Sequence, residues 1–101
     1  IIRGGENISP EEVENILYEC PKVADASLIG VPDPDWGQNP MACVVVKEGE
    51  ICTEQEILDF CKQKLPGFKR PTSVVFIDEL PRTSTGKVQR KVLREKYSGR
   101  P

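Results

Sequence analysis

The segment SPEEVENILYECPKVADASLIGV, residues 9–31, contains the clearest helix and strand patterns of the chain. It opens with a capping box, in which the Ser9 hydroxyl can accept a hydrogen bond from an amide of the first turn and the Glu12 carboxylate can reach back to the cap. Proline follows the cap, where its missing N–H costs no helical bond. Three apolar residues then recur at helical spacing: Val13, Ile16 and Leu17. The helix is expected to end near Cys20, and the alternating segment 23–31 predicts a strand.

The rest of the chain continues in the same way. A second capping box at Thr53 opens a helix that stops before Pro66. Its apolar face is expected to hold Ile57, Leu58, Cys61 and Leu65. Further elements are expected as strands over 41–47 and 72–77 and a basic helix over 89–97, with a loop over 32–40. The order helix, strand, strand, helix, strand, helix predicts an α+β fold with about three helices on a small, mostly antiparallel sheet.

Length and composition predict one globular domain over residues 1–101. The chain has 101 residues, 38% of them hydrophobic and 30% charged, which is enough for a core but too little to enclose a large substrate pocket as well. No apolar run approaches the roughly 20 residues needed to span a bilayer. The chain lacks an initiator Met and a signal peptide, and we expect it to be a piece of a longer protein.

Cysteine and histidine usage excludes several site classes. The four cysteines, at 20, 43, 52 and 61, form no CxxC pair, and there is no histidine, so neither a zinc site nor catalysis by a Ser/His or Cys/His pair is expected. Their number would allow a disulfide framework, but the regular helix and strand patterns need none. We therefore expect free thiols, a cytoplasmic location and no metal ligands in this chain.

The net charge of −2 hides a strong asymmetry. Residues 1–60 carry three basic and 13 acidic side chains, whereas residues 61–101 carry 11 basic and three acidic ones. Such a division indicates an anionic partner for the second part, such as nucleic acid, a phosphate-rich ligand or another domain. A basic helix that simply faces water would explain the charge run equally well.

Three segments contain candidate binding residues. Lys87 stands in the polar run PRTSTGK, which lacks P-loop spacing and could be an ordinary surface turn or could present a cation to developing negative charge. The glycines of RGGEN (3–7) allow close approach of a ligand or a simple turn. Trp36 and Phe68 lie outside the periodic segments, where they could stack on a base or cover the edge of the core.

Taken together and in order, four runs resemble the C-terminal domain of acyl- and aryl-CoA ligases in the adenylate-forming superfamily. They are RGGENISPEEVE (3–14), VADASLIGVPDPDWGQ (23–38), FKRP (68–71) and ELPRTSTGKVQRKVLR (79–94). The resemblance covers essentially the whole chain, and the last run is its most specific part. It implies a mobile cap on a large N-terminal domain, absent here, which binds ATP with Mg²⁺ and a carboxylic acid.

The resemblance also implies roles for individual residues. Lys87 is similar to the lysine that reaches the carboxylate and phosphate oxygens while the acyl-adenylate forms. After the cap rotates, a second set is expected to contact coenzyme A: Gly5 and Glu6 at the pantetheine tunnel, and Trp36, Phe68, Lys69 and Arg70 around the nucleotide. Thr72 stands where some relatives carry a basic residue, so no phosphate contact is expected from it. A fatty or an aromatic acid fits the closest resemblance as substrate, and of the two we expect a fatty acid.

Other classes of function remain as alternatives at this stage. A nucleic-acid-binding module would use the basic 82–100 segment and bind in a salt-dependent way, but the acidic half and the absence of a nucleic-acid motif argue against it. A non-catalytic interaction domain would tolerate substitutions of Lys87 and Gly5. Within the superfamily, an adenylation domain that loads a carrier protein is the alternative to a CoA ligase. The isolated chain is expected to fold but to lack activity.

Overall fold

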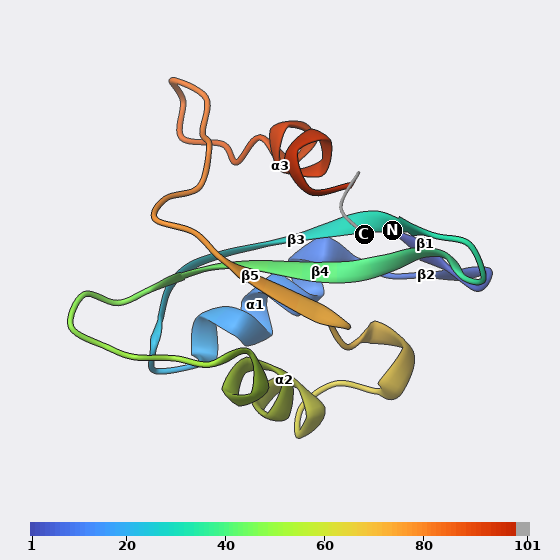
Figure 1. The fold of residues 1–101 in the computed structure, drawn as a ribbon, viewed down its shortest axis with the longest axis horizontal. Helices are drawn as coiled ribbons and strands as arrows, with labels where there is room; N and C mark the ends of the chain where they lie inside the picture. The colour runs from blue at the N-terminus through green and yellow to red at the C-terminus, as the bar shows by residue number, and fades with distance from the viewer. Residues whose placement is uncertain (99–101) are drawn as a thin grey trace.

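The computed structural model of the protein describes residues 1–98. The elements are β1 (Ile2–Arg3), β2 (Glu6–Asn7), α1 (Pro10–Glu19), β3 (Val23–Asp33), β4 (Gly37–Val46), α2 (Glu54–Lys62), a 3-10 turn (Gly67–Lys69), β5 (Ser73–Phe76) and α3 (Arg90–Tyr97). Figure 1 shows α1 and α2 on one face of a small sheet, with α3 and the loop before it on the other. The predicted α+β class and its three helices are confirmed.

The sheet is built around one long hairpin. β3 and β4 pair antiparallel from end to end, β1 joins β4 antiparallel, and only β5 runs parallel to its neighbour β4. The expected loop over 32–40 is wrong, because both strands continue through their prolines and leave only 34–36 as the connection. Pro32 has the same orientation along β3 as Leu28, whose amide points away from β4, so its missing N–H removes no ladder bond.

Both faces of the central hairpin are buried. Leu28 and Ala42 pack into the core under α1 and α2, while the next residues along each strand, Ile29 and Cys43, pack into a second core. The larger core also contains Val13, Leu17, Val23, Ala26, Val44, Ile57, Cys61 and Leu65. The smaller one, beneath α3, is completed by Leu80, Leu93 and Tyr97. Burial on both faces suits the continuous apolar runs at 28–31 in β3 and 41–46 in β4.

Each capping box forms only its hydroxyl-to-amide hydrogen bond. The Ser9 hydroxyl accepts a bond from the Glu12 amide at 3.4 Å, and Thr53 accepts one from the Glu56 amide at 3.2 Å, as predicted. The carboxylates of the two glutamates do not complete the boxes. That of Glu12 contacts Lys69 at 2.8 Å instead, and that of Glu56 binds a lysine outside its helix. Tertiary ion pairs thus replace the expected local bonds.

The four cysteines carry free thiols, and three of them are buried. Burial raises the pKa of the Cys43 thiol to about 12 and that of Cys61 to about 11. Since the thiolate is the reactive form, these two side chains serve packing at neutral pH.

A buried carboxylate joins the two helical layers. Glu14 of α1 accepts a hydrogen bond from the Leu28 amide at 2.7 Å and from the Ser27 hydroxyl at 3.1 Å. The same carboxylate receives Nη2 of Arg90 at 2.6 Å and its Nε at 3.2 Å. Because Arg90 begins α3, this pair connects helices on opposite faces of the sheet around the edge of β3.

We expect Glu14→Ala to destabilise the chain by about 3 kcal/mol, because it leaves the Arg90 guanidinium and the Leu28 amide without their carboxylate. Glu11→Ala is the matched control, since Glu11 also reaches Arg90, at 3.6 Å, but its side chain is 69% exposed. Its cost should stay below about 1 kcal/mol. Urea unfolding of both variants measures the difference, and equal losses would contradict the assignment.

Candidate functional site

The paired glycines form the tip of a hairpin between β1 and β2 that the sequence did not predict. Gly4 has a φ of +55° and Gly5 one of +83°, in the region that favours glycine. The Gly4 amide donates to the carbonyl of Trp36 at 2.7 Å, and a Cβ there would lie 2.7 Å from Cε3 of the indole. A Cβ on Gly5 would meet nothing within 4 Å. Gly4 therefore serves the packing of the turn, whereas Gly5 faces open space.

Beside this turn lies a hollow of about 320 Å³, here called the tryptophan hollow. It is lined by Arg3, Gly4, Glu6, Trp36, Gly67 and Phe68. Trp36 is 53% exposed and Phe68 39% exposed, so both rings remain open to a ligand. The structure thus brings together three residues that were predicted to share a site, Glu6, Trp36 and Phe68, with Gly5 next to them in the chain.

The side chains that support this hollow were not among the predicted site residues. Asp33 accepts hydrogen bonds from the amides of Asp35 and Trp36, each at 2.9 Å, and its other oxygen accepts one from Asn39 at 2.8 Å. Asn39 in turn accepts Nε of Arg3 at 3.0 Å. Aspartate before a turn commonly bonds the next amides, so the run PDPDWG contained a signal for Asp33. Nothing in the sequence indicated the partners of Asn39.

Two predicted residues lie beside the hollow but do not line it. The ammonium of Lys69 bonds both carboxylate oxygens of Glu12, at 2.8 and 3.0 Å, and lies 5.7 Å from the centre of the Phe68 ring. Nε of Arg70 donates to the carbonyl of Leu65 at 2.7 Å. Each of these cations therefore has a partner that an anionic ligand would have to displace or share.

Lys87 is exposed on a separate hairpin over residues 82–88. Arg82 pairs with Val88 at its base, and the Thr83 amide donates to the Lys87 carbonyl at 2.8 Å. Figure 1 shows this segment projecting from the face of the sheet that α3 covers. No hydrogen bond or ion pair engages the Lys87 ammonium within residues 1–98, and Lys87 does not line the tryptophan hollow. The cation is thus presented on an ordered turn, free to meet an anion.

An ion pair fixes the base of this hairpin. One nitrogen of Arg82 donates to the Gly86 carbonyl across the hairpin, and another meets the Asp25 carboxylate, both at 2.7 Å. The Tyr18 hydroxyl of α1 also donates to Asp25. Burial disfavours ionisation of Asp25, but the bonds from Arg82 and Tyr18 outweigh it and hold the pKa of the carboxyl below its usual value.

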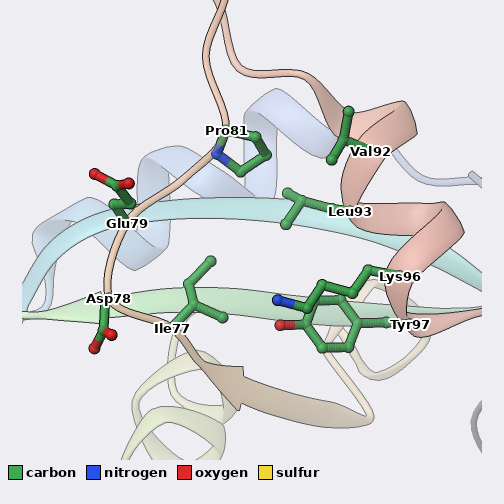
Figure 2. A pocket seen from close by; sticks show the side chains of 8 residues that line it. All are labelled: Ile77, Asp78, Glu79, Pro81, Val92, Leu93, Lys96 and Tyr97. Carbon is green, nitrogen blue, oxygen red and sulfur yellow. The ribbon is translucent and has the colours of Figure 1, made fainter.

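A second hollow, of about 390 Å³, lies between the segment 77–81 and α3. Figure 2 shows Ile77, Pro81 and Leu93 along it, with Lys96 and Tyr97 extending from α3 towards Ile77. Its apolar lining continues the smaller core. None of the predicted site residues lines it.

Comparisons with known proteins place this geometry in context. A family model described as "AMP-binding enzyme C-terminal domain" matches residues 12–87. The 2-methylpropanoate–CoA ligase of Humulus lupulus is 48% identical over 101 residues, which cover 98% of this chain and 18% of that ligase.

Solved structures of related enzymes contain a domain with the same fold. ATP-bound MatB from Rhodopseudomonas palustris superposes with a TM-score of 0.94 at 39% identity, over 98% of this chain and 20% of that one. A Mycobacterium tuberculosis fatty acyl CoA synthetase gives a TM-score of 0.90 at 42% identity, over 97% and 19%. The chain thus spans about a fifth of the length of these relatives.

We expect Gly4→Ala to displace the indole of Trp36, because the new methyl group would overlap the ring. It should shift the emission of Trp36, the only tryptophan of the chain, and lower the free energy of unfolding by about 2–3 kcal/mol. Gly5→Ala is the control, since it introduces the same kind of backbone strain, about 1–2 kcal/mol, without the overlap. Fluorescence and denaturant unfolding measure both effects. Unchanged emission in Gly4→Ala would contradict the contact.

Proposed function

This chain belongs to the family of AMP-binding enzyme C-terminal domains, and we propose that it is the C-terminal domain of an ATP-dependent, AMP-forming carboxylic acid–CoA ligase. The observation that carries the proposal is the presence of two separate surfaces, an unpaired lysine on an anchored hairpin and an aromatic hollow beside a glycine turn. Each suits one half of a two-step reaction in which an acyl-adenylate forms and is then attacked by a thiol.

In the first step Lys87 supplies positive charge. The acid is a carboxylate and ATP a polyanion, so their approach is repulsive, and charge accumulates on the carboxylate and α-phosphate oxygens as the new bond forms. A positioned ammonium relieves this repulsion. The 82–88 hairpin suits the role because Arg82 holds its base while the Lys87 side chain stays exposed.

In the second step the opposite end of the domain binds coenzyme A. The open space at Gly5 suits passage of the pantetheine arm, and Glu6 lies at the margin of the same hollow. Trp36 and Phe68 offer aromatic faces to the adenine. Lys69 and Arg70 follow directly and would meet the phosphates, Lys69 by exchanging Glu12 for the ligand.

The separation of the two surfaces bears on how they are used. Lys87 lies on the hairpin beyond the α3 face, and the glycine turn lies at the β1–β2 end of the sheet. If both act at one catalytic centre, the domain must turn between the steps. We therefore propose that it is a mobile cap on an N-terminal domain that binds ATP with Mg²⁺ and the acid.

The fatty acid expected from the sequence is part of this proposal, and likeness to a fatty acyl CoA synthetase supports it. Pyrophosphate exchange by the full-length enzyme with a panel of fatty, short branched and aromatic acids tests it. We propose that the domain alone makes no acyl-adenylate and that its partners are its own N-terminal domain, the acid and CoA, without nucleic acid.

No helix within residues 1–98 is long and apolar enough to cross a membrane. The cytoplasmic location stays a prediction.

In the full-length enzyme we expect Lys87→Ala to lower ATP–pyrophosphate exchange by about 10²–10³-fold, because one placed cation is lost from the adenylation step. Thioester formation from a supplied acyl-adenylate should survive. Lys91→Ala is the matched control, since it removes another exposed lysine from the same region and should change neither step. If Lys87→Ala leaves both steps intact, the domain is a docking module and the proposal fails.

Gly5→Leu should spare adenylation and slow thioester formation by about 10- to 100-fold, because its side chain would obstruct the path of the thiol. Gly5→Ala is the control that separates the effect of side-chain size from that of backbone strain. Alanine and leucine are both strained at the positive φ of this position, but only leucine fills the open space. The two half-reactions are followed separately. Equal damage to both steps by Gly5→Leu would count against the tunnel.

A further inference from the structure

Arg3 is the residue that joins the separate walls of the tryptophan hollow. It belongs to β1, whereas Trp36 follows β3 and Phe68 lies in the 3-10 turn before β5. We propose that Arg3 is a positioning residue, which holds the Trp36 ring and the backbone of Phe68 in the arrangement that accepts the CoA nucleotide. This inference rests on the proposed function, because it assumes that the hollow binds CoA.

Three contacts carry the inference. The guanidinium carbon of Arg3 lies 5.2 Å from the centre of the Trp36 ring. Its Nη1 donates to the carbonyl of Phe68 at 3.2 Å, and its Nε donates to Asn39 at 3.0 Å. One side chain therefore touches the tryptophan wall, the phenylalanine wall and β4 between them.

Asn39, which accepts a hydrogen bond from Arg3, is itself held by a further hydrogen bond. Asn39 donates to one oxygen of Asp33, whose other oxygen accepts the amide of Trp36. The indole is consequently fixed twice, by its backbone through Asp33 and by its ring through Arg3. The contact of Gly4 with the same indole completes the support, since its amide bonds the Trp36 carbonyl.

The chemistry of arginine suits this position better than that of lysine. A planar guanidinium can lie over an aromatic face while its edge donates in two directions, whereas an ammonium is a point charge on a flexible stem. No strand pairing joins the segments that carry Trp36 and Phe68. Without Arg3, the distance between these two side chains would depend on two loops. We infer that removing Arg3 loosens the hollow without disturbing the sheet.

The test measures substrate dependence in the full-length enzyme. Arg3→Ala should raise the KM for CoA about tenfold, as expected from the loss of a ring contact and a bridging donor. Reaction with pantetheine, which has the same thiol but no nucleotide, should stay within about twofold of the parent enzyme, as should pyrophosphate exchange. Arg3→Lys should give an intermediate KM for CoA, because it retains the charge but not both bonds. Lys47→Ala, an exposed charge loss elsewhere, controls for net charge.

Trp36→Ala separates this inference from the proposed function. If Trp36→Ala raises the KM for CoA and Arg3→Ala does not, the positioning role is overturned and the nucleotide site stands. If Arg3→Ala impairs CoA, pantetheine and pyrophosphate exchange alike, Arg3 merely supports the fold and the inference is again overturned. If neither variant changes the KM for CoA, the hollow does not bind the nucleotide, and that part of the proposed function fails as well.

Discussion

The Glu14 carboxylate of α1 accepts hydrogen bonds from two other elements. The Leu28 amide and the Ser27 hydroxyl donate to it from β3, and the Arg90 guanidinium donates to it from α3. A buried charge of this kind is tolerable only when its partners are all in place, because removing one of them leaves another uncompensated. These partners belong to β3, at the edge of the sheet, and to α3, on the face opposite α1. Glu14 therefore couples the positions of α1, β3 and α3 to one another.

Other side chains of α1 extend this coupling towards both candidate surfaces. Glu12 holds Lys69 next to the tryptophan hollow, and Tyr18 bonds Asp25, the carboxylate that receives Arg82 at the base of the Lys87 hairpin. α1 contributes none of the residues that we expect to touch a substrate. It nevertheless sets the position of segments that do, which makes it the common support of the two surfaces.

These contacts also protect the outer edge of the sheet. β3 is long and has no strand beyond it within the described part of the chain, a situation that invites pairing with other chains. The Leu28 amide is occupied by Glu14, the Ala26 carbonyl by Tyr18 and the Ala26 amide by Asp25, and Pro32 has no N–H to offer. The residues that connect the layers are thus the same ones that occupy the free edge.

Charges in this domain divide into those with structural partners and those without. Arg3, Arg82 and Arg90 each bridge several groups, as the forked guanidinium allows. The exposed ammonium of Lys87, by contrast, has no hydrogen-bond or ion-pair partner among residues 1–98. The basic half of the chain is therefore not a uniform surface. Within it, Arg82 and Arg90 hold segments of the fold together, whereas the Lys87 side chain stays exposed.

The local elements and the order of the family motifs could be predicted from the amino-acid sequence alone. Ser9 and Thr53 predicted two helix starts, the apolar periodicity predicted three helices and the main strands, and the motif runs placed Lys87, Gly5 and Trp36 among the candidate residues. These features could be predicted because caps, periodicity and motifs depend on residues a few positions apart. The extent of the central hairpin was underestimated, since proline argues against a strand until its place at an edge is known.

Which distant side chains contact one another depends on the packing of the folded chain. The carboxylates of Glu12 and Glu56 leave their predicted local bonds for lysines brought close by folding. The contacts of Arg3 with Asn39 and Phe68 join residues 36 and 65 positions apart, and Glu14 meets Arg90 across 76. No local pattern encodes such pairs, because their geometry exists only after the helices and the sheet have packed. The sequence specified the groups that can bind, and the packing of α1, β3 and α3 decided where each group is held.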